Sequence, residues 1–415
     1  MTKTELPNSL KNNNKSLRSL LFITWDSDSS NYLESLFFPI LKGIQKEGGT
    51  ICHVMQFSWA GAEEVERIGK LAEGMGLHYV HHPIHRRPSA ILGALMSVYQ
   101  GVYQIRQYVR EHQVNILMPR STMPAMMVNR LGSWLKRKKV KVIFDADGLP
   151  LEERVDFSGL KPNSSQYAFL KREERKIINM ATRVITRSKK SVDIHLEVVG
   201  LKFADKFHVV SNGRDAAMFY YDAQTKAQVR EELGLGKKEI LWVYTGTLGK
   251  PYLVAEMLGL FAAFLSKGNQ GKFLILTRNP SYLKSLISPA LKAHLIVRTG
   301  EFRDIPRFLM AADLGLSLRS PAPSLAGLAP IKLGEYLMCG LPVMVSRDVG
   351  DTEELLEDKE FCFFYEKGKE AAFLEWFENL APINPEVIHN FGLAHFGLQS
   401  SIAQYLKVLD FGGEG

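Results

Sequence analysis

Short apolar segments with strand character alternate with helical patterns along almost the whole chain, and this alternation limits the fold more than any other feature. In the first half, strands are predicted at Leu20–Thr24, Ile51–Phe57, Leu77–His81 and Val114–Met118. Between the last two, apolar residues recur at four–three spacing from Ile91 to Val109, which predicts an amphipathic helix. Strands joined through helices pair in parallel, so this half is expected to form one parallel sheet wrapped by helices.

The second half repeats the alternation after an Asn-Gly turn at Asn212–Gly213. A chain of 415 residues is long enough for two such domains, so the predicted fold class is α/β with two doubly wound, Rossmann-like domains. Residues 1–16 are mostly polar and rich in asparagine, and we expect them to form a disordered tail. The strands and helices of the second half are expected at Ile240–Tyr244, Met257–Phe264, Phe273–Leu276, Leu295–Val297, Ile305–Ala311 and Leu314–Leu318.

Hydropathy and cysteine usage indicate where such a protein would work. No segment approaches the ~18–20 uninterrupted apolar residues that span a bilayer, and no signal peptide precedes the first strand. The three cysteines are widely spaced and include no Cys-x-x-Cys pair, which argues against a disulfide framework or a zinc site. A reducing cytoplasm is therefore the expected compartment.

The positive charge of the chain narrows the class of partner. A formal net charge of +8 and a pI of about 9.1 suit a phosphorylated substrate, an anionic membrane surface or nucleic acid. Nucleic acid is the least favoured of these, because the sequence has no zinc-finger or RRM-type signature. Trp134–Lys141 is a concentrated basic patch, which is either a solvated helix end or a contact with acidic lipid headgroups.

The segment from Ala329 to Glu354 combines a helix, a sharp stop and a buried strand. Lys332–Met338 has helical spacing, Gly340 can adopt the left-handed conformation that ends a helix, and Pro342 prevents further helix before the strand Val343–Val345. Glu335 lies in the middle of this helix among apolar neighbours. Either its carboxylate faces solvent or it is buried and needs a partner, since burial without one would cost several kcal/mol.

This segment carries the clearest family resemblance of the chain. The pattern Pro330-x-Lys332-x-x-Glu335-Tyr336 with Gly340, Pro342 and Gly350 resembles the nucleotide-binding signature of retaining GT-B glycosyltransferases. It is most similar to the bacterial branch that builds capsular polysaccharide, exopolysaccharide and lipopolysaccharide. The resemblance implies that Glu335 binds the ribose hydroxyls of a sugar nucleotide. Many members have a second glutamate eight positions earlier that contacts the donor sugar, but this chain has Gly327 there, so the backbone amides of Gly327, Leu328 and Ala329 are expected to take its place.

Two further segments correspond to donor-binding loops of that family. In Tyr244–Lys250, Gly246 and Gly249 would let the backbone approach a diphosphate, while Lys250 and a helix N-terminus would stabilise its charge. Thr247 stands where many relatives have an arginine. Val297–Phe302 resembles the base-binding loop, with Phe302 at the nucleobase, although a plain strand-to-helix loop would have a similar sequence.

Phe144–Val155 admits three interpretations. Asp145-x-Asp147-Gly148 is similar to the nucleophile motif of haloacid-dehalogenase phosphatases. Val349–Thr352 is similar to the metal-binding motif of the same phosphatases. An Asp-x-Asp pair also occurs in GT-A transferases, which would leave the second half of the chain unexplained. The third interpretation adds Arg120-Ser121 and Glu152–Val155 and resembles a bacterial GT-B subset, in which Asp147 replaces the usual arginine.

The resemblance as a whole implies a hexosyl- or N-acetylhexosaminyltransferase that retains anomeric configuration and takes UDP-sugar rather than GDP-sugar. Arg120, Lys250 and Lys332 would stabilise the departing diphosphate without a metal or other cofactor. Asp145 or Glu153 would orient a glycan or lipid-linked acceptor beside Asp26 and Ser27, which lie in the polar turn at the carboxyl edge of the first sheet. The enzyme would act in the cytoplasm or at the inner face of the membrane.

The resemblance also implies how the chain is divided. Residues 17–207, completed by a C-terminal helix within 390–415, would bind the acceptor, and residues 208–389 would bind the nucleotide sugar across a cleft. Two other classes stay open: a magnesium-dependent phosphatase relying on Asp145 and Asp147, and a sugar-nucleotide-binding protein without activity. The latter is suggested by Gly327, by Thr247 and by the lack of a glycine loop after the first strand.

Overall fold

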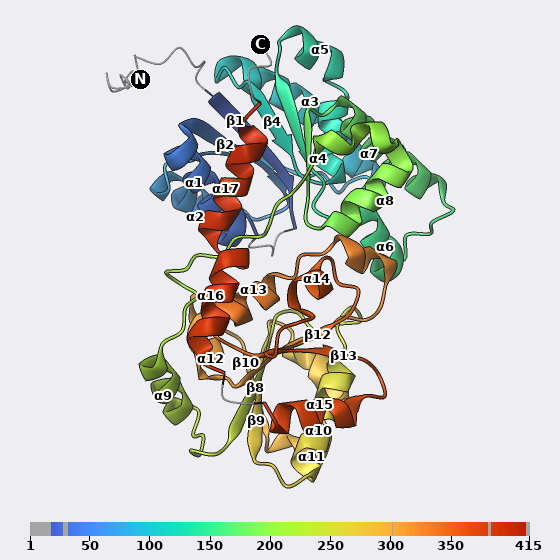
Figure 1. Ribbon diagram of the computed structural model, residues 1–415. Coiled ribbons are helices and arrows are strands. Elements are labelled where there is room, and N and C mark those ends of the chain that lie inside the picture. Colours follow the sequence, from blue (N-terminus) through green and yellow to red (C-terminus); the bar gives the residue numbers. More distant parts are fainter. Residues whose placement is uncertain (1–17, 28–31, 301, 381–382, 412–415) are drawn as a thin grey trace.

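The computed structural model describes residues 18–27, 32–300, 302–380 and 383–411. Two parallel sheets, each covered by helices on both faces, form two domains that face each other (Figure 1). The predicted fold class is therefore confirmed. The tail expected at residues 1–16 lies outside the described residues. In the described part of the chain, no helix has both the length and the apolar character needed to cross a membrane.

The first sheet has the strand order β3-β2-β1-β4-β5-β6-β7, and every described pair is parallel. Its strands are β1 (Arg18–Trp25), β2 (Thr50–Ser58), β3 (His78–Pro83), β4 (Ile116–Pro119), β5 (Lys141–Asp145), β6 (Arg183–Thr186) and β7 (Phe207–Val209). Its helices are η2 (Leu33–Phe37), α1 (Phe38–Gly48), α2 (Ala62–Gly74), α3 (Ala90–Glu111), α4 (Thr122–Asn129), α5 (Gly132–Arg137), α6 (Pro150–Ser158), α7 (Ser165–Met180), α8 (Lys189–Val199) and η3 (Leu201–Lys206).

Alternation along the interior strand β1 explains the two layers of helices. Leu21 and Ile23 belong to the core cluster beneath α3, α4 and α7, whereas Leu20 and Phe22 belong to the cluster beneath α1, α2 and α17. All four side chains are fully buried. A strand that is apolar on both faces requires cover on both sides, as parallel sheets usually have.

The second sheet has the order β10-β9-β8-β11-β12-β13, again parallel throughout. Its strands are β8 (Ile240–Thr245), β9 (Gly271–Leu276), β10 (Leu295–Arg298), β11 (Leu314–Ser317), β12 (Val343–Ser346) and β13 (Cys362–Tyr365). The remaining helices are α9 (Ala223–Glu232), α10 (Val254–Ser266), η4 (Pro280–Ser285), α11 (Pro289–Lys292), η5 (Phe302–Asp304), α12 (Ile305–Ala311), η6 (Pro323–Gly327), α13 (Ile331–Met338), α14 (Thr352–Leu356), α15 (Glu370–Glu378), α16 (Pro385–Phe396) and α17 (Leu398–Leu409).

The chain passes between the domains twice, and the two passages lie side by side. Arg214, after β7, forms an isolated parallel bridge with Gly397, which separates α16 from α17. Helix α16 packs on α13 of the second domain, whereas α17 packs on α1 of the first, where its Tyr405 and Val408 enter the core (Figure 1). The C-terminal segment expected at 390–415 is therefore divided at Gly397, where a Cβ would lie 2.4 Å from the carbonyl oxygen of Leu393.

Polar contacts hold the domains together along one side. The Asp351 carboxylate of the second domain accepts hydrogen bonds from the backbone amides of Lys189 (2.7 Å) and Lys190 (3.4 Å), at the N-terminus of α8. A negative charge is stabilised at that end of a helix. The backbone amide of Ser324 donates to Asp156 of α6 at 2.9 Å. The structure thus has the two domains in direct contact beside the ends of their strands.

Candidate functional site

The chain reverses its winding direction in the first sheet between β1 and β4, which are neighbours in the sheet but not in sequence. Open α/β sheets bind ligands at such a switch point, outside the carboxyl ends of the strands. Asp26 follows β1, Arg120 follows β4, Asp145 ends β5 and Arg187 follows β6. All four residues therefore lie on one edge of the sheet, which we call its carboxyl edge.

The charged side chains of this edge are paired with one another. Asp145 and Arg187 form an ion pair of 2.6 Å, and both are almost fully buried. Asp147 forms an ion pair with Arg120, and its Oδ1 lies 3.8 Å from Nε of Arg187. Asp147 has the left-handed φ of +54°, which aspartate tolerates better than most residues. Together with Asp26 these residues form what we call the first-domain charge cluster.

Asp26 completes this cluster at the switch point. Its carboxylate accepts hydrogen bonds from Thr24 Oγ1 and from Gln56 Nε2, both at 3.0 Å. Burial raises the pKa of Asp26, while the charge of Arg120 and the two hydrogen bonds oppose that shift. Ser27 follows as an exposed residue. Glu153 is also exposed on α6, within the electrostatic reach of Arg319 from the second domain. The three residues predicted for the acceptor thus surround the edge that faces the second domain.

On the second domain, Lys332 is held in an aromatic setting near the end of β8. Its Nζ lies 4.2 Å from the ring centres of Tyr244 and Tyr252 and donates a hydrogen bond to the Tyr244 hydroxyl at 2.8 Å. Gly246 lies against the same side chain: a Cβ there would be 3.0 Å from Lys332 Cε, and the φ of +120° disfavours any other residue. The local sequence thus brings the predicted phosphate turn and Lys332 together.

Lys332 is a cation without an anion. Among the residues that the structure describes, no carboxylate forms an ion pair with it, although Glu335 is one turn further along α13. Burial, together with the nearby positive charge of Arg319, holds the pKa of Lys332 well below its usual range. Arg319 lies 4.5 Å from the Tyr252 ring centre. We call Lys332, Arg319, Tyr244 and Tyr252 the Lys332 site, and its chemistry suits a multiply charged anion such as a diphosphate.

Glu335 is buried, so the solvent-facing alternative is wrong, and its partner is Arg214. Nε of Arg214 lies 2.9 Å from Oε1 of Glu335, and Nη1 of Arg214 donates to the carbonyl of Ser35 in the first domain at 2.7 Å. Pro39, four residues after Ser35, has no N–H to donate to that carbonyl. Burial raises the pKa of Glu335, and Arg214 opposes the shift.

Arg214 also links Glu335 to the predicted base loop. Its guanidinium lies 5.4 Å from the ring centre of Phe302, which in turn packs on Phe219. Arg214, Glu335 and Phe302 therefore form one contiguous group. No sequence signal points to Arg214, because it lies in the passage between the domains, far in sequence from α13, and belongs to no periodic pattern.

Gly327 has a physical reason to lack a side chain. It packs backbone to backbone against the first domain, where a Cβ on Gly327 would lie 2.6 Å from the backbone nitrogen of Leu149. Conversely, a Cβ on Gly148, whose φ is +78°, would lie 2.3 Å from the Gly327 carbonyl oxygen. The position at which the resemblance led us to look for a second glutamate is therefore filled here by the other domain.

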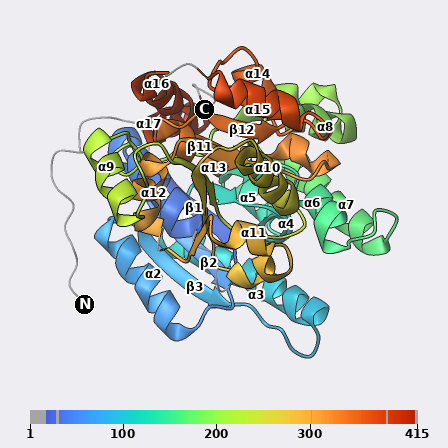
Figure 2. The ribbon, with the colours of Figure 1, turned by 90° about the horizontal axis from the view of Figure 1, so that it is seen from below.

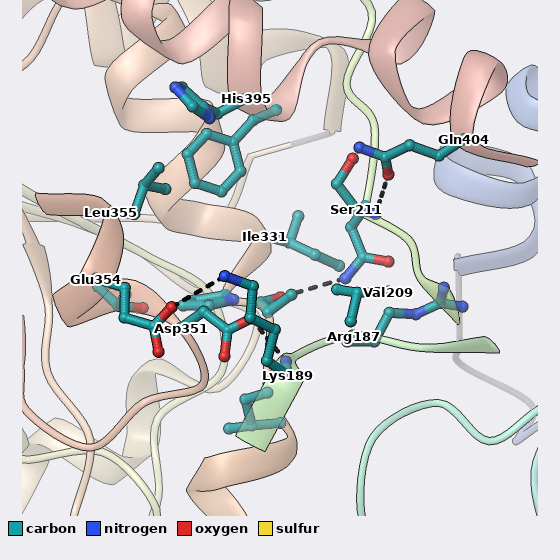
Figure 3. Close-up of a pocket in the computed structure, with 16 residues that line it drawn as sticks. Arg187, Lys189, Val209, Ser211, Ile331, Asp351, Glu354, Leu355, His395 and Gln404 are labelled. Carbon is teal, nitrogen blue, oxygen red and sulfur yellow. Dashed lines mark hydrogen bonds and ion pairs between the residues drawn. The ribbon is translucent and has the colours of Figure 1, made fainter. Parts of the chain in front are cut away.

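Leu328 and Ala329 line a cavity of about 290 Å³ between the domains (Figure 3). The cavity lies beside both chain passages, next to Arg187, Asn212 and Gln404. Neither Lys332 nor Glu335 lines it. The residues predicted to bind the donor are thus divided between two places: Leu328 and Ala329 line this cavity, whereas Lys332 and Glu335 lie outside its lining.

The other residues of the predicted phosphate turn are more exposed. Thr247 and Lys250 are exposed, Gly249 is half-buried, and the Thr247 carbonyl accepts a hydrogen bond from Tyr244 at 2.6 Å. The Lys250 carbonyl accepts one from Ser320 at 2.7 Å. The backbone of the turn is thus fixed to the Lys332 site and to the loop that follows β11, while the side chain of Lys250 is exposed. A phosphate contact by Lys250 stays a prediction.

The geometry does not favour the phosphatase interpretation. Asp145, its nucleophile, is fully buried and engaged by Arg187. Asp351, in the segment that mimics the metal-binding motif, caps α8 across the domain interface. A phosphatase nucleophile must reach a substrate phosphate, which a buried and paired carboxylate does not do. Within the described ranges, no three His, Cys, Asp or Glu side chains form a group able to hold a metal ion.

Comparison with known proteins agrees with this fold. Residues 240–381 match the family model described as "Glycosyl transferases group 1". A search of curated protein sequences found no match.

Three solved structures illustrate the structural likeness. HepE from Anabaena in complex with UDP and glucose is 15% identical and has a TM-score of 0.69, over 95% of this chain and 99% of that one. HepE in complex with UDP-glucose is 13% identical with a TM-score of 0.67, over 94% and 99%. A glycosyltransferase from Rickettsia africae is 14% identical with a TM-score of 0.68, over 95% and 98%. At this identity the likeness shows the fold, which is the GT-B arrangement of two Rossmann-like domains.

Proposed function

We propose that the protein is a glycosyltransferase that moves a hexosyl or N-acetylhexosaminyl group from a UDP-sugar to a glycan or lipid-linked acceptor. The observation that carries the proposal is Lys332, a cation without a carboxylate partner one turn from the buried Glu335, in a domain matching group 1 glycosyltransferases. The complexes of HepE with UDP and with UDP-glucose support UDP over GDP as the donor nucleotide. The proposal includes a role in bacterial surface polysaccharide synthesis, as the resemblance of residues 329–354 implies.

On the donor side, each part of the nucleotide sugar has a proposed contact. Lys332 and Arg319 would bind the diphosphate, since two cations match its charge without a metal. Glu335, held in place by Arg214, would accept hydrogen bonds from the ribose hydroxyls, and Phe302 would lie at the base. The backbone of the turn at Gly246 would approach the phosphates, because Gly246 already lies against Lys332.

On the acceptor side, the first-domain charge cluster would set the position of the attacking hydroxyl. Arg120 and Asp145 are fixed by their ion pairs, so their proposed role is to shape the site and stabilise developing charge. Asp26 and Glu153 are the carboxylates proposed to accept a hydrogen bond from the acceptor hydroxyl. Transfer with retention requires stabilisation of a departing diphosphate on the same face, which is the work proposed for Lys332. Contact between the domains would exclude water.

The proposal also covers where the enzyme acts. The three cysteines are free, and two of them, Cys52 and Cys339, are buried. Free thiols suit a reducing compartment, so a cytoplasmic enzyme working at the inner face of the membrane is proposed. The basic patch Trp134–Lys141 would help to hold it there.

The test is calorimetric titration of the protein with UDP, GDP, ADP and CMP in metal-free buffer, beside Glu335→Ala and the control Glu375→Ala. Glu375 is an exposed glutamate in the middle of α15. UDP is expected to bind, and Glu335→Ala should weaken it at least tenfold, or about 1.4 kcal/mol, while the control leaves it unchanged. Absence of nucleotide binding, or binding indifferent to Glu335, would reject the proposal. UDP binding without turnover of any UDP-sugar and acceptor would leave a binding protein.

A further inference from the structure

Helix α3 has apolar side chains on the face that is exposed. Leu92, Met96, Tyr99 and Tyr103 follow one another at four–three–four spacing and are 51%, 47%, 63% and 69% exposed. Ile91 beside them is 65% exposed. We call these five residues the α3 stripe. Scattered apolar residues on a surface are ordinary, but a contiguous row on one helix face indicates an interaction site.

The stripe cannot turn inward, because glycines fix the opposite face of the helix. A Cβ at Gly93 would lie 2.3 Å from the carbonyl oxygen of His85, and one at Gly101 would lie 2.5 Å from Sδ of Met127. The inner face also buries Val98 and Ile105 completely. Helix α3 is thus apolar on both faces over its first four turns: Ala90–Ile105 contains no charged residue. Figure 2 shows α3 at the outer edge of the first domain.

Basic side chains surround the stripe. Residues 78–144 contain eleven Arg and Lys and a single acidic residue, Glu111, a net charge of +10 within a chain of net charge +8. Arg130 lies 5.3 Å from the ring centre of Tyr99, and Arg106 and Arg110 lie 5.6 and 5.9 Å from that of Trp134 on the neighbouring α5. The exposed run Lys136–Lys139 begins two residues after Trp134.

Most of these cations have no carboxylate to neutralise them. Among the described residues, no ion pair is formed by Arg86, Arg87, Arg106, Arg110 or the four basic residues of 136–139. Unpaired basic groups around an exposed apolar row match an anionic lipid surface, where the apolar chains enter the acyl boundary and the cations contact headgroups. A second copy of this chain would bring two like-charged surfaces together, which is unfavourable.

We propose that the α3 stripe and the unpaired cations around it form a surface that docks onto an anionic lipid bilayer. The position suits an acceptor held in that bilayer. Helix α3 follows β3, so its N-terminal end with Ile91 and Leu92 lies at the carboxyl edge of the first sheet, the edge that carries Asp26 and Arg120. The inference extends the acceptor side of the proposed function, on which it rests, yet lipid docking can be measured without donor or acceptor.

Flotation with mixed phosphatidylcholine–phosphatidylglycerol vesicles, compared with pure phosphatidylcholine vesicles, tests the apolar part of the surface. The wild-type protein should float with the anionic vesicles and not with the neutral ones, and less so as salt increases. The triple variant Leu92→Ser, Met96→Ser, Tyr103→Ser should lose at least about tenfold in vesicle affinity, because three apolar side chains no longer enter the bilayer. The control Leu201→Ser removes a 79% exposed leucine in η3 and should float like the wild type.

Charge variants test the second half of the inference. Lys138→Gln with Lys139→Gln should weaken binding to the anionic vesicles by about thirtyfold, whereas Lys237→Gln with Lys238→Gln, an exposed pair in the second domain, should not. Equal binding to neutral vesicles, absence of flotation, or a triple variant that floats like its control would overturn the inference. The inference would also be overturned if the wild-type protein were a dimer in solution and the triple variant a monomer. UDP titration of the same variants, expected to match the wild type, shows that they are folded and separates a failure here from a failure of the proposed function.

Discussion

The two carboxyl edges that face each other in this molecule are both charged, but they differ in whether the charges are matched. In the first-domain charge cluster, Arg120 and Arg187 are paired with Asp147 and Asp145. At the Lys332 site, Lys332 contacts two tyrosine rings and the Tyr244 hydroxyl, Arg319 contacts the Tyr252 ring, and neither cation forms an ion pair with any residue that the structure describes. The first edge is electrostatically complete without a ligand, whereas the second is completed by an anion. We infer that donor binding energy comes chiefly from the second edge and that the first edge fixes geometry.

Breaking a pair in the first edge should have the largest effect of all. Asp145→Ala leaves the Arg187 guanidinium buried without its carboxylate, and this should destabilise the fold by about 3–5 kcal/mol. Urea unfolding followed by circular dichroism measures the change. Asp193→Ala removes an exposed aspartate from α8 and serves as the control. If the free energy of unfolding falls by less than about 1 kcal/mol, the ion pairs of the first edge do not stabilise the fold.

Adding one carbon atom at Gly327 tests the contact between the two edges. Gly327→Ala places a Cβ 2.6 Å from the backbone nitrogen of Leu149, so the domains must move apart or the loop must shift, at a cost of about 1–3 kcal/mol. Small-angle X-ray scattering should show a larger radius of gyration, and thermal unfolding should begin at a lower temperature than in the wild-type protein. Gly259→Ala, in α10, is the matched control, because a Cβ there would meet nothing within 4 Å. An unchanged scattering curve would show that the glycine contact does not set the distance between the domains.

The unmatched edge predicts a smaller, pH-dependent effect. Burial and Arg319 lower the pKa of Lys332, and a bound diphosphate should raise it again, so UDP binding should take up protons at a pH between the pKa of the free protein and that of the complex. Because the bound state holds more protons, UDP affinity should fall as the pH rises above the lowered pKa, by up to about 1.4 kcal/mol per pH unit. Titrations in buffers of different ionisation enthalpy, kept well above about pH 6 where the UDP phosphate itself titrates, measure the uptake. If the wild-type protein releases protons on binding UDP, or exchanges none, the result contradicts the unpaired charge at Lys332.

The sequence was sufficient for the local structure and for the side chains that belong to one motif. Alternating strands and helices predicted both sheets, and Gly340 does adopt the left-handed φ (+75°) expected beyond α13. Lys332 and Glu335 were found because they lie one turn apart in a recognisable pattern. Their surroundings were not predictable, because Arg214, Arg319 and Tyr252 come from other elements and follow no periodicity.

The comparison of Lys250 with Lys332 shows the same limit. The glycine turn made Lys250 a candidate for the phosphates and the pattern from Pro330 to Gly350 made Lys332 one, and only the packing of α13 against β8 distinguishes them. The Tyr336 hydroxyl accepts a hydrogen bond from the backbone amide of Thr245 at 2.9 Å, which fixes that packing and directs Lys332 between two tyrosine rings. Lys250, in contrast, is exposed to solvent. Similarly, Pro39 indicates that the Ser35 carbonyl lacks its α-helical donor, but not that Arg214 from the passage between the domains would bind it.

The central claim, that the second edge lacks an anion which the donor supplies, is tested most directly by UDP affinity in Lys332→Met beside Lys250→Met. Methionine keeps the length of the side chain and removes the charge. We expect Lys332→Met to weaken UDP binding by about 2–3 kcal/mol in metal-free calorimetry, the value of a charge-assisted contact. Lys250→Met should change it by less than about 1 kcal/mol, as for an exposed charge. UDP affinity that survives Lys332→Met, or that depends on Lys250 instead, would contradict the account.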